Sequence, residues 1–196
     1  HGVHAVLANK QNIFHYDAPL PVCETASIFS ELLVNERMKK EKPKLAKQIL
    51  LTQIDDFYAS IMRQAWFVIF EETAHDMVAE HPSVDMMAAT YKKQLQEQFG
   101  NALEVPDVFA YEFLYIPHIF HTPFYCYAYS FGNLLSLALF AQYKKNPAFA
   151  GKIVAFLAKG GSESPAKMVK TLGFDLADEN FWQGGFDVIK KMIKEL

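Results

Sequence analysis

A long segment in which apolar residues recur with the period of an α-helix limits the folds that this sequence can adopt. Between residues 44 and 80, six apolar side chains recur three to five positions apart: Leu50, Ile54, Phe57, Ile61, Ala65 and Phe70. This period lines one face of an α-helix, whereas a half-buried strand would show strict alternation. The segment therefore predicts a long helix packed through a bundle, and "HPS" at 81–83 ends it.

The rest of the chain shows the same period, and no alternating strand exceeds a few residues. Further helices are expected at 1–10, 24–40, 84–99 and 123–145, with three shorter ones after them. The proline-containing segments 11–22 and 101–122 are expected to be loops, and "KGGSESP" and "GFDLADEN" separate the last helices. There is no internal repeat or flexible linker, so residues 1–196 are interpreted as a single all-α domain.

Charge and composition exclude several classes of protein. A formal net charge of -3 provides no basic field for nucleic acid, and no apolar run approaches the roughly 18 residues that span a bilayer. The two cysteines, Cys23 and Cys126, are far apart, which favours a reducing compartment over a disulfide framework. The first residue is His, not Met, which predicts a piece of a longer protein.

Two groups of residues near the start of the chain could bind a metal. His1 and His4 are three positions apart, on one face of a helix, and could chelate or could be ordinary surface or core histidines. Glu24, Ser27 and Glu31 share another helix face. A carboxylate row beside core residues needs a partner such as a metal, but by themselves these residues favour a solvated first helical turn.

The segment "YIPHIFHTPFYCYAYSFG" concentrates hydrogen-bond donors. It contains two histidines and three tyrosines of interest within 12 residues: His118, His121, Tyr125, Tyr127 and Tyr129. Tyrosine and histidine donors suit the stabilisation of an oxyanion, although an aromatic core with hydroxyls at its rim is a common alternative. In "FEETAH", the pairing of Glu71 or Glu72 with His75 is interpreted as a structural hydrogen bond rather than a chelate.

Taken in order, these segments resemble the M3 family of zinc metallopeptidases, oligoendopeptidase F branch. The opening "HGVH" is similar to the last four positions of the family motif H-E-x-G-H-x-x-H, and "CETASIFSE" is similar to E-x-x-S-x-x-x-E. The resemblance implies that His1 and Glu24 are zinc ligands. It also implies that a further histidine ligand and the general-base glutamate lie upstream of this chain, which is then the C-terminal catalytic portion of its parent.

The resemblance further implies a mostly helical fold around a deep channel and a cytoplasmic enzyme that cleaves short peptides. His118, Tyr125 and Tyr127 are the expected catalytic donors, and His121 and Tyr129 are expected to bind substrate. Without the upstream groups, the chain alone is expected to be inactive and to depend on the remainder of its parent chain. The alternative is a non-catalytic all-α module that binds peptides or a partner, and an H-E-x-x sequence directly before His1 would exclude it.

Overall fold

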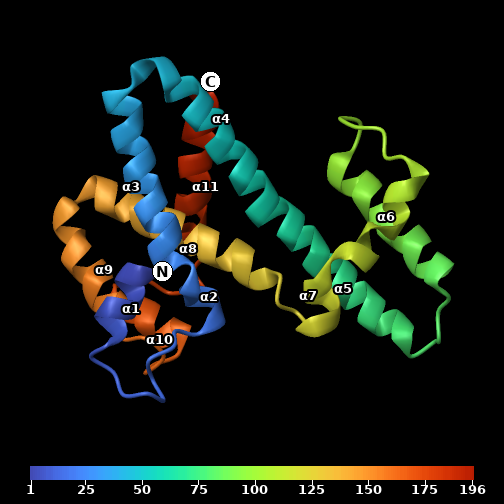
Figure 1. Cartoon of the computed structure of the whole chain (residues 1–196), viewed down its shortest axis with the longest axis horizontal. Helices are drawn as coiled ribbons and strands as arrows, with labels where there is room; N and C mark the ends of the chain where they lie inside the picture. Colours follow the sequence, from blue (N-terminus) through green and yellow to red (C-terminus); the bar gives the residue numbers. More distant parts are fainter. The chain divides into compact units, whose positions relative to one another are not determined.

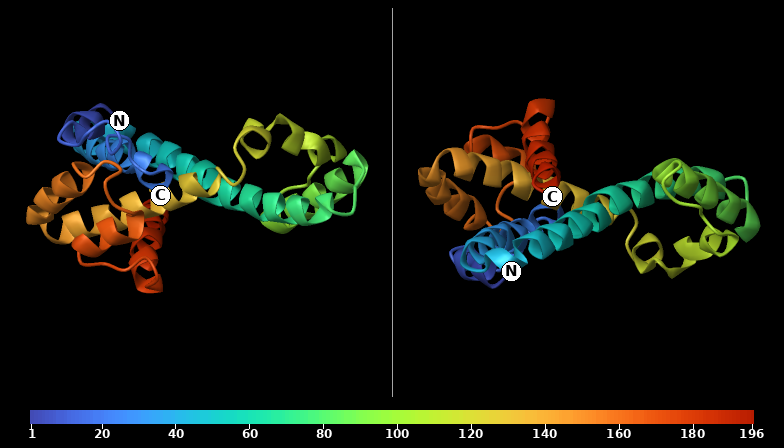
Figure 2. Two further views of the ribbon diagram at one scale, coloured as in Figure 1. Left: turned by 90° about the horizontal axis from the view of Figure 1, so that it is seen from below. Right: turned by 90° about the horizontal axis from the view of Figure 1, so that it is seen from above.

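The computed structural model describes residues 1–196 and contains helices and loops but no strand (Figures 1 and 2). The all-α fold expected from the sequence is therefore confirmed. The chain divides into two compact units, one formed by residues 1–61 and 131–196 and the other by residues 62–130. The expectation of a single domain over 1–196 stays a prediction.

The first unit, called unit 1, has a core of helices from both ends of the chain. Its elements are α1 (Gly2–Ala8), α2 (Leu20–Cys23), α3 (Thr25–Glu41), η1 (Pro43–Leu45), α4 (Ala46–Phe57), most of α8 (Tyr127–Lys145), η4 (Pro147–Phe149), α9 (Ala150–Leu157), α10 (Pro165–Thr171) and α11 (Glu179–Lys194). Helix α4 contacts α3 and α11, while α9 contacts α1 and α10. Val22, Leu135, Leu137, Phe156 and Met168 are fully or almost fully buried where these helices meet.

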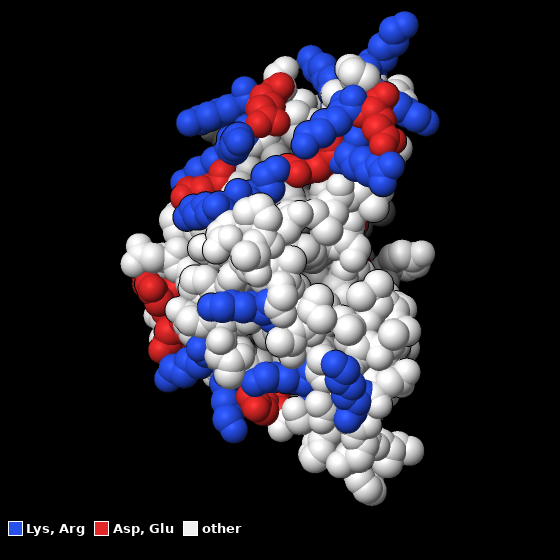
Figure 3. Space-filling view, turned by 90° about the vertical axis from the view of Figure 1, so that its left-hand side faces the viewer, with Lys and Arg blue, Asp and Glu red and all other residues white.

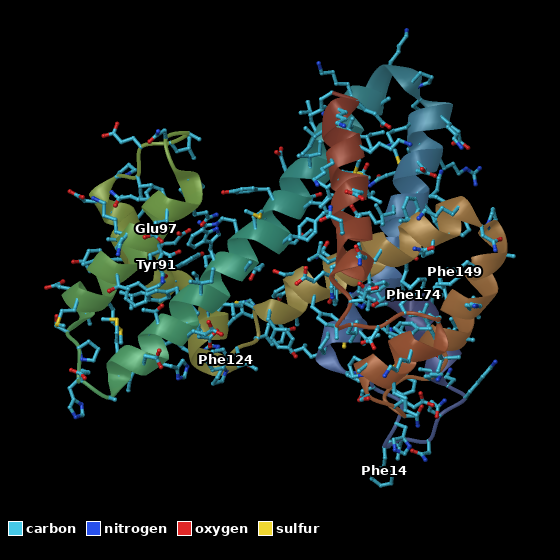
Figure 4. All side chains as sticks on the ribbon, turned by 180° about the vertical axis from the view of Figure 1, so that it is seen from behind. Phe14, Tyr91, Glu97, Phe124, Phe149 and Phe174 are labelled. Atoms are coloured by element: carbon cyan, nitrogen blue, oxygen red, sulfur yellow. The ribbon has the colours of Figure 1, made fainter.

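Side-chain caps begin the last two helices of unit 1. The Ser164 hydroxyl accepts a hydrogen bond from the Lys167 backbone N–H, and Pro165 follows in the first turn of α10. The Asp178 carboxylate accepts from the Asn180 N–H at the start of α11. These caps satisfy backbone donors that have no partner inside a helix, which explains why "KGGSESP" and "GFDLADEN" separate helices. Between them, Phe174 packs edge-on against Phe149 at a ring distance of 6.0 Å (Figure 4).

The second unit, called unit 2, is smaller. Its centre is a pair of helices that follow one another in the sequence and pack together. It contains α5 (Gln64–Val78), α6 (Val84–Phe99), η3 (Asp107–Tyr115) and α7 (Pro117–His121), and its boundary falls within the π-helical segment η2 (Tyr58–Arg63). Helices α5 and α6 lie side by side, and α6 also packs against η3. The rings of Phe70, Tyr91 and Phe113 meet in the core at centroid distances of 4.8 to 5.8 Å (Figure 4 labels Tyr91).

The helix boundaries differ from expectation in two places. The long helix predicted from 44 to 80 is divided into α4 and α5 by the π-helical segment η2, in which the backbone accommodates wider turns. The segment 101–122, predicted to be a loop, contains η3 and α7, and α8 begins at Tyr127 rather than Pro123. Prolines 106 and 117 caused the error at 101–122, because proline also stands directly before or in the first turn of short helices.

Charged side chains are unevenly distributed over unit 1. Figure 3 shows Lys and Arg, interspersed with acidic residues, gathered at the end of this face where α3 leads into α4. The lysines of that segment are Lys39, Lys40, Lys42, Lys44 and Lys47. Much of the face below this end carries no charge in Figure 3. None of the helices combines the length and the hydrophobicity that a membrane-spanning segment requires.

Candidate active site

His1 and Glu24 meet in unit 1. His1 occupies the N-cap position of α1, and Glu24 is the single residue between α2 and α3. The His1 Nε2 atom lies 3.2 Å from Glu24 Oε2, and the two side chains are 68 % and 32 % exposed. A short loop and α2 return the chain to the start of α1, so two residues 23 positions apart converge at the surface.

Two neighbours hold the Glu24 carboxylate in this position. The Ser27 hydroxyl, one turn further along α3, lies 2.9 Å from Glu24 Oε2 and can donate to it, with the Glu24 carbonyl oxygen at the same distance. Gly132 of α8 passes close by, because a Cβ atom there would lie 3.3 Å from the Glu24 Cβ atom. A larger residue at 132 would therefore displace Glu24 or α8.

The His1 and Glu24 atoms fit two positions of a zinc site. Two ligand atoms at about 2.0–2.2 Å from a tetrahedral zinc are about 3.3–3.6 Å apart, close to the separation found here. Imidazole nitrogen and carboxylate oxygen are both common zinc donors. No group of three or more His, Cys, Asp or Glu side chains gathers in a metal-binding arrangement. The pair thus provides atoms for two of the three positions that protein residues fill at a catalytic zinc.

His4 does not join this pair. It is 7 % exposed, unlike His1, and its Nε2 atom is buried without a hydrogen-bond partner. Burial lowers the pKa of His4, and the backbone of Cys23 and Leu157 acts in the opposite direction. The neutral ring is therefore favoured, and His4 packs as part of the interior beneath α1.

Three of the five histidines and tyrosines selected in this segment form a cluster in unit 2. The His118 ring stacks on Tyr125 at 5.0 Å, and Tyr129 packs edge-on against both. The Tyr129 hydroxyl and His118 Nε2 share a hydrogen bond of 3.2 Å. The Tyr125 hydroxyl makes no hydrogen bond within this unit, which leaves its proton free for another acceptor.

The other two residues of the segment take no part in that cluster. Tyr127 is 41 % exposed, and His121 is exposed at the end of α7. Tyr127 was expected to be catalytic and Tyr129 to bind substrate, but it is Tyr129 that packs with His118 and Tyr125. The roles of all five residues remain predictions, because their packing does not test what they do.

A buried carboxylate that sequence reasoning did not place at the site lies beside this segment. Glu71 of α5 is completely buried, and its Oε1 atom accepts a hydrogen bond of 2.6 Å from the Phe124 backbone N–H. His75 Nε2 is 4.0 Å from the same oxygen. The structural hydrogen bond expected between Glu71 or Glu72 and His75 in "FEETAH" is therefore not formed, and Glu71 instead accepts from a distant loop. No helical spacing signals such a bond.

Comparison with known proteins identifies the class to which this fold and these residues belong. The profile of Peptidase family M3 matches residues 1–188, so the chain belongs to that family. Within it, the chain is similar to members of the oligoendopeptidase F branch. It is 32 % identical to an oligoendopeptidase F homolog of Borreliella burgdorferi over 100 % of its length, and 24 % identical to the oligopeptidase PepF of Bacillus subtilis, also over 100 %.

Solved structures agree with this placement. A crystal structure from Chlamydophila abortus, described as that of a peptidase, superposes with a TM-score of 0.86 and 28 % identity over 99 % of the chain. The oligoendopeptidase-F of Enterococcus faecium, at 22 % identity and a TM-score of 0.78 over 89 % of the chain, shares the fold. The chain covers 34 % of the B. burgdorferi relative, 30 % of the B. subtilis relative and 33 % of the C. abortus chain. It thus spans about a third of the length of these proteins.

Proposed function

We propose that this chain carries part of the active site of a zinc-dependent oligoendopeptidase that hydrolyses short peptides in the cytoplasm. The observation that carries the proposal is the 3.2 Å approach of His1 Nε2 to Glu24 Oε2 within a member of Peptidase family M3. His1 and Glu24 would bind the metal, together with a histidine outside this sequence. When bound, zinc supplies a Lewis acid and an activated water for attack on the peptide carbonyl.

In this proposal, the residues of unit 1 orient the metal-binding groups. Ser27 donates its hydroxyl proton to Glu24 Oε2, which restricts the rotation of the carboxylate. Groups that hydrogen-bond to a ligand fix its direction and raise metal affinity. The general base that removes the proton from water would be a glutamate outside this sequence, as the family resemblance implies. The chain alone would therefore bind zinc weakly and cleave no peptide.

The residues of unit 2 would stabilise the negative charge that develops on the carbonyl oxygen. Tyr125 is the best placed donor of its cluster, since its hydroxyl is free while Tyr129 shares its own with His118. Stacking on His118 and the edge contact with Tyr129 hold the Tyr125 ring in one orientation. Such preorganisation is what gives an oxyanion donor its effect, because no group has to reorient during the reaction.

The first test concerns the metal and uses the complete peptidase, meaning the chain at the length of its relatives. Glu24→Gln should reduce the bound zinc measured by elemental analysis after dialysis at low free zinc. Glu41→Gln, an exposed residue of the same helix, is the matched control and should keep a full zinc content. Equal zinc content in the two variants would refute the assignment of Glu24.

The second test separates the tyrosines by steady-state kinetics on a short quenched peptide. Tyr125→Phe should lower kcat by about 10²–10³, the usual effect of removing one oxyanion donor, with a smaller change in KM. Tyr127→Phe and Tyr129→Phe measure the other two candidates under the same conditions. If all three variants melt like the wild type and keep kcat within about twofold, the oxyanion role of this segment is wrong.

A further inference from the structure

The turn that carries Tyr125 has an unfavourable backbone conformation. Phe124 has a φ of +56°, in the left-handed region that residues with a Cβ atom rarely adopt. Phe124 is directly before Tyr125, so its φ and ψ angles set the direction in which the chain enters the tyrosine segment. The Tyr125 N–H bonds to the Thr122 carbonyl at 3.1 Å and closes a β-turn with Pro123 and Phe124 at its centre. A type II turn requires a positive φ at the second central residue, a position that glycine fills without strain and phenylalanine does not.

Helix α5 provides two contacts that hold Phe124. The Glu71 carboxylate accepts the Phe124 N–H at 2.6 Å, and the His75 ring, one helical turn further on, stacks on the Phe124 ring at 4.9 Å (Figure 4 labels Phe124). The distance is at the short end of the range for N–H···O hydrogen bonds. Both contacts come from one face of α5, so the turn is fastened to a rigid element rather than to another loop.

Glu71 has no other interaction that would explain a buried carboxylate. It is 0 % exposed, its Oε2 atom has no hydrogen-bond partner, and the His75 Nε2 atom is 4.0 Å from its Oε1 atom. Burial of a carboxylate is costly unless the group is well paired. Burial raises the pKa of the neighbouring Cys126 thiol, and the charge of Glu71 raises it further. The Phe124 bond is thus the one strong interaction that offsets this cost.

We propose that Glu71 is a positioning residue, which locks the left-handed turn at Phe124 and thereby directs Tyr125 into its cluster with His118 and Tyr129. The proposal deepens the proposed function and rests on it for its catalytic consequence, although the effect on the turn stands independently. Glu71 touches neither substrate nor metal in this account, and it acts only through the backbone between 124 and 125.

The test compares three variants of the complete peptidase. Glu71→Leu fills a similar volume without an acceptor, Glu71→Gln keeps an acceptor oxygen, and Glu72→Leu changes the adjacent exposed residue of the same helix. Hydrogen exchange at the Phe124 amide should become at least tenfold faster in Glu71→Leu. It should stay within about threefold of wild type in Glu71→Gln and Glu72→Leu.

Steady-state kinetics on the same variants tests the catalytic consequence. Glu71→Leu should lower kcat at least tenfold while KM changes less than about threefold, and Glu71→Gln should restore most of kcat. Unchanged exchange at Phe124 in Glu71→Leu would overturn the proposal, and so would a Leu variant that fails to fold, since the effect is then not local to the turn. Faster exchange with unchanged kcat would instead support the positioning of the turn and count against the catalytic role of Tyr125.

Discussion

A Cβ atom on Gly185 would lie 2.9 Å from the backbone carbonyl oxygen of Leu134. Gly185 belongs to α11 and Leu134 to α8, so these two helices of unit 1 approach each other as closely as their backbones allow. The same Cβ atom would also meet the Leu137 Cβ atom at 3.4 Å. Only glycine fits here without a shift of one helix, and Leu137 is part of the core on which the arrangement of unit 1 depends.

The pair "GG" at 184–185 therefore offers a matched test of this packing. Gly185→Ala should destabilise the chain by about 1–3 kcal/mol, the usual cost of overpacking. Gly184→Ala has nothing within 4 Å of its new Cβ atom and should be neutral or stabilise by up to about 1 kcal/mol, since alanine favours a helix. Urea unfolding followed by circular dichroism measures both. Equal effects of the two changes would contradict the close packing of α11 on α8.

Glu112 should be the polar residue on which the stability of unit 2 most depends. It accepts hydrogen bonds from Arg63 Nη2 at 2.6 Å and from the Tyr91 hydroxyl at 2.7 Å, in a partly buried position. Glu112→Ala leaves both donors without their partner and should cost about 2–4 kcal/mol of unfolding free energy. The control Asp107→Ala removes the exposed ion pair with Lys92 and should leave the melting temperature unchanged. Similar melting of both variants would disprove the role of the Glu112 network.

Ser27 should contribute to metal affinity in the complete peptidase without being a ligand. Ser27→Ala removes the hydroxyl 2.9 Å from Glu24 Oε2 and should weaken zinc binding about 10- to 100-fold. Competition with a chromophoric chelator measures the dissociation constant. Ser30→Ala, an exposed serine of the same helix, should leave it unchanged. An unaltered constant in Ser27→Ala would show that Glu24 needs no such support.

The Cys126 thiol should make the folded chain less stable as the pH rises above 9. Burial, and then the Glu71 charge, raise the pKa of this thiol from 9.0 to about 11. The unfolded chain therefore loses the thiol proton first as pH rises, and stability present below pH 9 is lost between pH 9 and pH 11. At pH 10 the loss relative to pH 8 is about 1.4 kcal/mol.

The measurement is urea unfolding at pH 8 and pH 10 for the wild type and Cys126→Ala. The alanine variant is less stable at both pH values because of its cavity, but its decrease over this interval should be smaller by about 1.4 kcal/mol. If the free energy of unfolding falls by the same amount in both proteins, the thiol does not lose its proton at a lower pH in the unfolded chain than in the folded one.

The fold class and most helix positions follow from the sequence because they depend on local patterns. Apolar periodicity predicted the long helix now divided into α4 and α5, and the helix expected at 84–99 has the bounds of α6. The capped breaks before α10 and α11 depend on Ser164 and Asp178, which act on backbone groups two or three residues away. The proline-rich stretch 101–122 was misjudged because the same residue begins short helices and interrupts long ones.

For the candidate site, the family resemblance selected His1, Glu24, His118 and Tyr125, and their roles stay predictions. Spacing could not show that Tyr129 rather than Tyr127 packs with His118, since the start of α8 decides which tyrosines point the same way. Nor could it show that Glu71 bonds to Phe124, 53 residues away. Residue types and local periods are properties of the sequence, whereas a buried carboxylate obtains its partner only when the tertiary structure excludes water and brings a distant backbone N–H to it.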